Sequence, residues 1–179
     1  MRAEKGIMTE DFQGAEQVAR WLTERRETVA VAEASAGGRL SAALTCVPGS
    51  SAWFLGAAIV YSAAAKEVLL GITAVTLASA GAVDPAAALL LARAVRARLS
   101  ATWGVAETGV AGPQGGRRSR KPAGLAYVAV VGPDGEAVRT VSTGRDERQA
   151  NQQAFAAGAL ALFAEVLASD QKGYPPMGG

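Results

Sequence analysis

A small hydroxyl residue and two glycines interrupt an apolar run, and this is the first place where the sequence could do chemistry. Residues 29–34 read Val-Ala-Val-Ala-Glu-Ala, and Ser35 follows, ahead of Ala36, Gly37 and Gly38. A serine at a strand-to-helix corner lies beside backbone N–H groups that can stabilise an oxyanion or hold a phosphate. The same pattern also suits a serine that only caps a helix, with glycines that allow a tight turn. Both interpretations of Ser35 stay open.

Lys66 is the side chain that we expect to activate this serine. The chain contains no histidine, so a lysine, carboxylate, tyrosine, thiol or bound water must carry proton transfer near neutral pH. Lys66 follows Tyr61 and Ser62 after a predicted strand, and burial would lower its pKa towards neutrality. The alternative is a lysine on the solvent face of a helix.

Two glutamates lie near the ends of predicted strands, and each allows two interpretations. Glu33 and Glu107 are either buried polar residues or groups that orient a catalytic side chain. The single cysteine, Cys46, is predicted to be a small buried apolar residue in a reducing compartment.

A glycine-rich stretch follows the strand that contains Glu107. Residues 108–116 read Thr-Gly-Val-Ala-Gly-Pro-Gln-Gly-Gly, and glycine lets backbone N–H groups approach a ligand closely. The stretch matches neither a Walker A loop nor a dinucleotide-binding fingerprint. The basic run at 117–121 is a solvated loop, a contact for a phosphate-bearing ligand or, third, a nucleic-acid contact. The residues predicted to bind substrate are Glu33, Gly37, Gly38, Thr108, Gly109, Gly112, Gly115, Gly116, Arg117 and Lys121.

The elements that must position these residues alternate between strands and helices. Apolar periodicity, turn residues and caps predict helices at 11–26, 37–47, 63–70, 84–99 and 147–168, and strands at 28–34, 53–61, 103–110, 125–131 and 137–141. The run at 28–34 has no alternation, which indicates burial on both faces of a parallel sheet. The order predicts a three-layer α/β/α sandwich with a mixed, mainly parallel sheet.

Length and composition narrow the class of protein. The 179 residues predict one domain, with a core at about 11–168 and loose termini. A formal net charge of +2 is too small for a nucleic-acid-binding face. The apolar runs are shorter than a membrane span and the N-terminus lacks the apolar core of a signal peptide, so we expect a cytoplasmic protein.

Several separate motifs, in order, resemble the CinA C-terminal domain family. They are Ala32-Glu33-x-x-x-Gly37-Gly38, Pro48-Gly49-Ser50-Ser51-Ala52-Trp53-Phe54-x-Gly56, Tyr61-Ser62-x-x-x-Lys66, Gly81-Ala82-Val83, Thr108-Gly109-Val110-Ala111-Gly112-Pro113-x-Gly115-Gly116 and Lys121-Pro122-x-Gly124. The resemblance covers about residues 11–167. It implies nicotinamide mononucleotide deamidase activity, which releases ammonia and nicotinic acid mononucleotide, without metal or cofactor. It also implies a nucleotide substrate, a homodimer, and a serine nucleophile activated by the lysine of the Tyr-Ser-x-x-x-Lys motif.

The chain departs from the family pattern at the nucleophile. Members typically read Ala-Glu-Ser-Cys-Thr-Gly-Gly where residues 32–38 read Ala-Glu-Ala-Ser-Ala-Gly-Gly. The serine position is therefore Ala34, the cysteine position Ser35 and the threonine position Ala36. An arginine that members carry near the start of the last helix aligns with Asn151.

Three hypotheses follow from this departure. In the first, the chain is a deamidase with Ser35 as shifted nucleophile, Lys66 as its base and Tyr61 as an orienting or stacking group. In the second, it is a catalytically silent homologue that binds a nucleotide or a partner protein, because neighbouring positions on a strand point to opposite faces. In the third, it is an amidase with a changed substrate.

Overall fold

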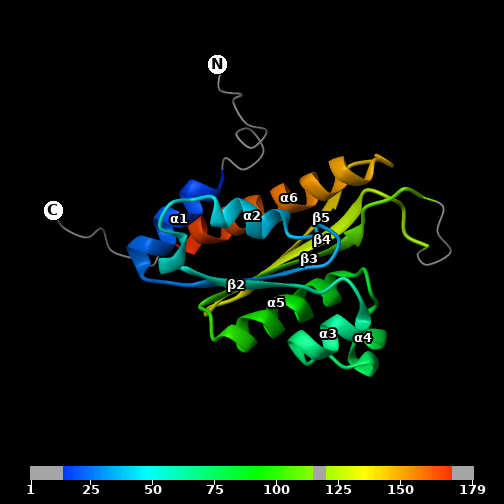
Figure 1. Ribbon diagram of the computed structural model, residues 1–179, viewed down its shortest axis with the longest axis horizontal. Coiled ribbons are helices and arrows are strands. Elements are labelled where there is room, and N and C mark those ends of the chain that lie inside the picture. The colour runs from blue at the N-terminus through cyan, green and yellow to red at the C-terminus, as the bar shows by residue number, and fades with distance from the viewer. Residues whose placement is uncertain (1–13, 115–119, 171–179) are drawn as a thin grey trace, which may run out of the picture.

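The computed structural model describes residues 14–114 and 120–170, which form a five-stranded sheet with helices on both faces (Figure 1). The elements in chain order are α1 (Gly14–Arg25), β1 (Val29–Glu33), α2 (Arg39–Thr45), the 3-10 turn η1 (Ser50–Ala52), β2 (Phe54–Ile59), α3 (Ala63–Leu70), α4 (Ala74–Ala80), α5 (Pro85–Leu99), β3 (Trp103–Val110), β4 (Leu125–Val131), β5 (Glu136–Ser142) and α6 (Arg148–Asp170). This confirms the predicted α/β/α sandwich.

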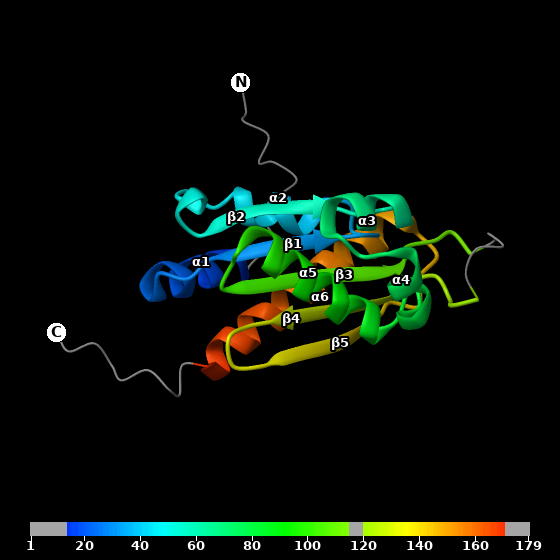
Figure 2. The ribbon, with the colours of Figure 1, turned by 90° about the horizontal axis from the view of Figure 1, so that it is seen from below.

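The sheet is mixed, and its order is β2-β1-β3-β4-β5 (Figure 2). β2 and β3 run parallel to β1, whereas β4 is antiparallel to both β3 and β5. Four strands therefore point the same way and β4 alone opposes them. The chain leaves β1 towards β2 on one side and returns to β3 on the other, and such a switch point opens a crevice beyond the carboxyl ends of the strands.

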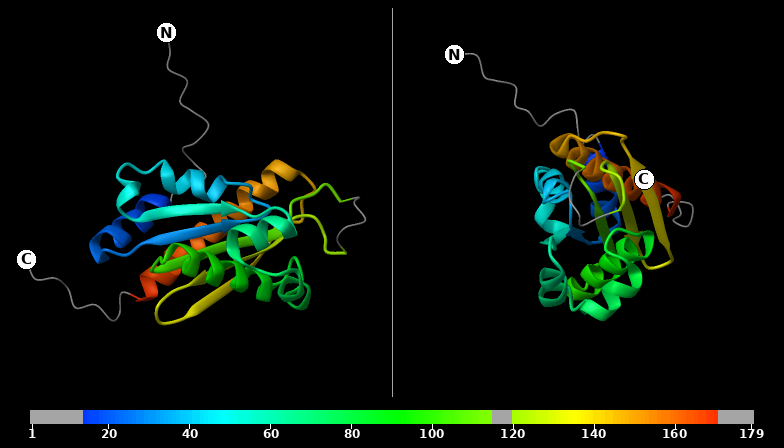
Figure 3. Two further views of the ribbon diagram at one scale, coloured as in Figure 1. Left: turned by 60° about the horizontal axis from the view of Figure 1, so that its bottom comes forward. Right: turned by 90° about the vertical axis from the view of Figure 1, so that its right-hand side faces the viewer.

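Two hydrophobic cores lie on opposite faces of this sheet. Helices α1, α2 and α6 cover one face, and α5 covers the other with α3 and α4 beside it (Figures 1 and 3). Every residue of β1 is fully buried, which confirms the burial predicted from its unbroken apolar run. This central strand carries the Ser35 turn at its carboxyl end.

Local sequence signals fix several element boundaries. The carboxylate of Asp84 accepts a hydrogen bond from the N–H of Ala86, and Pro85 is the first helical residue of α5, as predicted. The N–H of Gly132 donates to the carbonyl of Gly135 in the predicted turn between β4 and β5. These signals act within a few residues, so they are readable from the sequence.

Two local predictions need correction. Residues 74–80 form α4, for which no helix was predicted, because Thr73 caps a short segment that carries no fully buried residue and so leaves no apolar stripe. Cys46 is exposed rather than buried, because it lies at the C-cap of α2, beyond the helical face that packs on the core. The predicted residues 11–13 of the first helix lie outside the described part of the chain.

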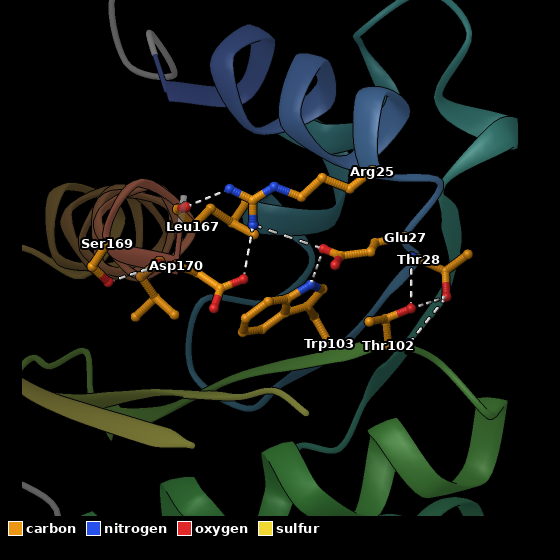
Figure 4. A network of polar contacts seen from close by, with 9 residues as sticks. Arg25, Glu27, Thr28, Thr102, Trp103, Leu167, Ser169 and Asp170 are labelled. Atoms are coloured by element: carbon orange, nitrogen blue, oxygen red, sulfur yellow. Dashed lines mark hydrogen bonds and ion pairs between the residues drawn. The ribbon is translucent and has the colours of Figure 1, made fainter. Parts of the chain in front are cut away.

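The amino ends of β1 and β3 are joined by a polar network (Figure 4). The Arg25 guanidinium donates to the Asp170 carboxylate at 3.0 Å and to the Leu167 carbonyl at 2.6 Å, which ties α1 to the end of α6. The indole N–H of Trp103 donates to Glu27 at 2.7 Å. These bonds clamp the end of the sheet that lies opposite the carboxyl ends of β1 and β3.

Helix α6 is long and apolar enough to cross a bilayer by length and composition alone, and α3 with α4 would reach that length only as a pair bent by 117°. Its apolar side chains instead pack against the sheet, where Phe155, Leu160 and Phe163 are fully buried. α6 is therefore a core helix of this α/β domain.

Candidate active site

A pocket of about 390 Å³ opens at the carboxyl ends of the parallel strands. The loop after β3, the start of α6 and the α3–α4 pair all lie at this end of the molecule (Figure 3). Its walls come from five segments far apart in the sequence: Ala34, Ser35, Tyr61, Lys66, Ala82, Val83, Thr108, Gly109, Val110, Ala111, Gly112, Pro113, Gln114 and Arg148. The predicted catalytic residues Ser35, Lys66 and Tyr61 thus meet at one pocket.

Ser35 is held rigidly at the turn that follows β1. Its hydroxyl donates a short hydrogen bond to Oε1 of Glu107, and its carbonyl accepts from the Gln152 side chain at 2.9 Å. The next N–H, of Ala36, donates to Oε2 of Glu107 at 2.8 Å. Ser35 is 5% exposed, and that small exposed part faces the pocket.

Glu107 is fully buried beneath this turn. Its position on β3 is in register with Glu33 on β1, so two carboxylates lie side by side in adjacent strands. Burial raises the pKa of Glu107 to about 7, and the negative charge of Glu33 adds to the rise, while the hydrogen bonds from Ser35 and Ala36 oppose it. Glu107 can therefore both accept and release a proton near neutral pH.

Lys66 is a buried cation on the pocket wall. It lies on α3, is 5% exposed, and forms no hydrogen bond from its ammonium to another described residue. Burial lowers the pKa of Lys66, and the negative charge of Glu107 partly offsets this effect. The alternative interpretation, in which Lys66 lies on the solvent face of a helix, is wrong. However, the hydroxyl of Ser35 is bonded to Glu107 and not to Lys66.

Glu33 serves the turn and not the pocket wall. Its carboxylate accepts hydrogen bonds from the N–H groups of Gly38, Leu40 and Ser41, at 2.8, 3.2 and 2.8 Å, and a short one from the hydroxyl of Ser41. A buried carboxylate needs such donors, and the start of α2 supplies them. The N–H of Gly38, predicted to bind an oxyanion or phosphate, is therefore already engaged, and the exposed Gly37 is not part of the pocket wall either.

The glycine-rich stretch shapes the pocket by close backbone approach. A side chain on Gly109 would lie 2.6 Å from Cβ of Ala126, so only glycine lets β3 and β4 come together there. Gly112 adopts a φ of +91° before a cis peptide bond to Pro113. Thr108, predicted to bind substrate, donates its hydroxyl to the carbonyl of Ala82 at 2.8 Å and so fastens the α4–α5 connection over the pocket.

The remaining predicted binding residues lie away from the pocket wall or outside the description. Lys121 lies 3.5 Å from the Asp84 carboxylate and 4.9 Å from the centre of the Tyr127 ring. Gly115, Gly116 and Arg117 fall outside the described residues.

Comparison with known proteins settles the family. The family model for the CinA C-terminal domain matches residues 11–167. The chain belongs to the CinA C-terminal domain family. It is 48% identical over 114 residues to a CinA-like protein of Synechococcus elongatus, a match that covers 64% of this chain and 27% of that protein. A CinA-like protein of Thermosynechococcus vestitus is 49% identical over 121 residues, covering 68% and 29% respectively. The chain therefore spans less than a third of the length of these curated relatives.

Solved CinA-family structures share the fold over nearly the whole domain. The competence/damage inducible protein CihA from Agrobacterium tumefaciens superposes with a TM-score of 0.79 at 31% identity, covering 91% of this chain and 99% of that one. A CinA superfamily protein from Klebsiella pneumoniae gives a TM-score of 0.82 at 27% identity, covering 89% and 99%. The recognised resemblance is thus confirmed at the level of family and fold.

Two of the positions at which the chain departs from the CinA pattern are Ala34 and Asn151, and the structure shows where each lies. Ala34, at the family's serine position, lines the pocket beside Ser35, so the corner places both neighbours on the wall. Asn151, at the arginine position, is fully buried, and its amide donates to the carbonyls of Ala111 and Arg145, each at 2.9 Å. Asn151 therefore holds two loops together rather than binding a ligand.

Arg148 is a charged pocket residue that the sequence analysis missed. Its guanidinium donates to the hydroxyl of Tyr61 and to the carbonyl of Gly112, both at 2.8 Å. It lies one helical turn before Asn151, so it brings an arginine into the pocket from a shifted position. The sequence did contain a signal for this residue. A cation in the first turn of a helix interacts unfavourably with the helix dipole, so an arginine there suggests a role in binding rather than in helix stability.

Proposed function

We propose that this pocket hydrolyses the carboxamide of nicotinamide mononucleotide, with Ser35 as the nucleophile. The observation that carries the proposal is the meeting of a hydroxyl, a buried lysine and an arginine at one pocket of a CinA-family domain. Its volume of about 390 Å³ falls in the range of small-molecule sites. CinA-family membership supports the substrate class.

Each pocket residue has a role in this proposal. Ser35 attacks the carboxamide carbon and forms an acyl ester, while Lys66 delivers a proton to the departing amide nitrogen. The guanidinium of Arg148 has five N–H donors and uses two of them for Gly112 and Tyr61, so the others can pair with the phosphate. Tyr61, 66% exposed, offers its ring to the pyridine. Water then cleaves the ester and restores Ser35.

The first test is ammonia release from nicotinamide mononucleotide by the purified protein. Activity that falls at least about 10³-fold in Ser35→Ala would support Ser35 as nucleophile, since removing a nucleophile leaves only residual catalysis. Lys66→Ala and Arg148→Ala separate the other roles, because Arg148→Ala should mainly raise KM. If the wild-type protein released no ammonia but bound nicotinamide mononucleotide in calorimetry, the proposed hydrolase activity would be refuted.

A second candidate is a nucleotide-binding homologue without catalysis, favoured by Ala34 at the family's serine position on the pocket wall. The triple change Ala34→Ser, Ser35→Cys and Ala36→Thr restores the family pattern. Activity gained from none would support the silent homologue, whereas loss of existing activity would support a rewired site. An amidase with a changed substrate would release ammonia from another amide and not from nicotinamide mononucleotide.

We further propose a homodimer formed through β2. This strand lies at the edge of the sheet, and Leu55, Ile59 and, on α3, Val68 are 43%, 51% and 73% exposed. An edge strand leaves backbone hydrogen-bonding groups unpaired, and the same strand of a second copy can pair with them across a two-fold axis. Sedimentation should show a dimer for the wild type and a monomer for Ile59→Lys; a monomeric wild type would contradict this proposal.

A further inference from the structure

We infer that Glu107, rather than Lys66, is the catalytic residue that takes the proton from Ser35, so that the two form a serine–glutamate dyad. The inference rests on the proposed use of Ser35 as a nucleophile. Its starting point is contact with the reacting atom, because the Ser35 hydroxyl donates directly to Oε1 of Glu107. A general base must lie within hydrogen-bond reach of the proton that it removes.

Both carboxylate oxygens of Glu107, and its backbone carbonyl, accept hydrogen bonds from the Ser35 turn, Oε1 from the Ser35 hydroxyl. Its second oxygen, Oε2, accepts the N–H of Ala36 at 2.8 Å, and its backbone carbonyl accepts the N–H of Ala34 at 3.2 Å. Gln152 holds the carbonyl of Ser35 from α6. Nucleophile and base are thus locked together by bonds that precede and follow Ser35 in the chain, which is the preorganisation that proton transfer needs.

The surroundings of Glu107 favour proton exchange over a purely structural bond. The residue is fully buried in a strand whose residues 103–108 are all buried, and a carboxylate there costs stability unless it is paired. Among the described residues, the negative charge of Glu33 in the neighbouring strand raises the pKa of Glu107, and the charge of Glu107 in turn raises the pKa of Lys66 on α3. Its pKa, raised to about 7, matches the operating range of a general base.

The proton balance of the step is complete. As Oγ of Ser35 bonds to the carboxamide carbon, its proton moves to Oε1 of Glu107. The C–N bond then breaks as the nitrogen takes a proton from Lys66 and leaves as ammonia, and the acyl group stays on Ser35. The proton held by Glu107 restores the ammonium of Lys66, so Glu107 is again a carboxylate. Water adds to the ester carbon with Glu107 again as base, the C–Oγ bond breaks, and the carboxylic acid and the Ser35 hydroxyl are regenerated.

The test measures Ser35 itself and needs no substrate. Phenylmethanesulfonyl fluoride sulfonylates activated serine hydroxyls, and peptide mass spectrometry locates and times the modification between pH 5 and pH 9. In the wild type we expect the rate at Ser35 to rise through an inflection near pH 7. Glu107→Gln keeps the shape of the side chain and an oxygen that accepts from Ala36, while its NH2 group can donate to the Ser35 oxygen but cannot take a proton. This variant should react at least about 100-fold more slowly and lose the inflection.

Two variants separate the dyad from its alternatives. Lys66→Met should keep the inflection near pH 7, whereas loss of the inflection in Lys66→Met and its persistence in Glu107→Gln would make lysine the base and overturn the inference. Glu67→Gln makes the same chemical change on the exposed side of α3 and should react like the wild type. Near-normal reactivity of Glu107→Gln, or no sulfonylation of wild-type Ser35 at any pH, would also overturn it.

The outcome is independent of the substrate proposal. If Glu107→Gln does not fold, the wild-type and Lys66→Met profiles still decide which group ionises. Sulfonylation that depends on Glu107, without ammonia release from nicotinamide mononucleotide, would retain the dyad and reject the substrate. Ammonia release from nicotinamide mononucleotide, together with a sulfonylation inflection that is lost in Lys66→Met and kept in Glu107→Gln, would retain the substrate and reject the dyad.

Discussion

Buried cationic side chains lie near both ends of the sheet, but they differ in their hydrogen-bond partners. At the amino ends of β1 and β3, the Arg25 side chain is 6% exposed and bonds to both Asp170 and the carbonyl of Leu167 (Figure 4). At the carboxyl ends, Lys66 is equally buried but has no hydrogen-bond partner for its ammonium among the described residues. Similar burial with different pairing indicates a structural clamp at one end and a reactive pocket at the other.

The largest expected effect comes from removing the ammonium of Lys66. In Lys66→Met we expect kcat for ammonia release to fall about 10²- to 10⁴-fold, as for the loss of an acid–base group. The free energy of unfolding at pH 7 should not fall, because methionine fills similar space without a charge to desolvate. Urea denaturation and the ammonia assay check both. A less stable but fully active variant would make Lys66 structural and erase the contrast.

A second prediction concerns the pH dependence of stability that Glu107 causes. The folded-state pKa of about 7 lies above the ordinary 4.5, so between these values the folded protein keeps a proton that the unfolded chain has released. This contribution is fully present below about pH 4.5 and is lost as the pH rises to about 7. The stability of Glu107→Gln relative to the wild type should therefore increase by about 2 to 3 kcal/mol between pH 5 and pH 8.

A matched variant sharpens the same measurement. Ser35→Ala removes a hydrogen bond that lowers the pKa of Glu107, so its stability should fall more steeply with pH than that of the wild type. Chemical denaturation at several pH values gives both curves. If the stability of wild type and Glu107→Gln changed with pH in parallel, Glu107 would have an ordinary pKa. The carboxyl ends of the strands would then not perturb a buried carboxylate.

The third prediction tests the clamp at the amino end. Arg25→Met should destabilise the protein by about 2 kcal/mol, since it leaves Asp170 and a helix-end carbonyl without their buried partner, while kcat stays within about twofold. Arg139→Met breaks an exposed pair with Glu165 and should cost less than about 0.5 kcal/mol. A large loss of activity in Arg25→Met at unchanged stability would mean that the two ends are coupled.

Much of the scaffold was readable from the sequence because its signals are local. The Asp84–Pro85 start of α5, the turn at Gly132–Gly135 and the apolar run of β1 each act over a few residues, and each prediction is confirmed. Helix α4 was not predicted, because its helical character depends on a cap and not on an apolar stripe. Local chemistry therefore predicted elements where periodicity or turn residues were strong.

The candidate site was only partly predictable. Ser35, Lys66 and Tyr61 were selected by residue type, and the fold brings them to one pocket. Neither the engagement of Glu33 with the start of α2 nor the reach of Arg148 to Tyr61 could be read from spacing. Arg148 and Tyr61 lie 87 residues apart, and no periodicity encodes such a distance. Glu33 lies only five residues from Gly38, but its contact depends on how the chain turns after β1.

By itself, the sequence determined the family, the α/β/α architecture and the absence of histidine, which restricts the acid–base chemistry to other groups. Only the tertiary structure decided which partner each reactive group has. Parallel pairing of β1 with β3 places Glu107 under the Ser35 turn, and the packing of α3 buries Lys66 near that carboxylate. The physical reason is that pKa and reactivity depend on burial and on charges within a few ångströms, which folding supplies from distant parts of the chain.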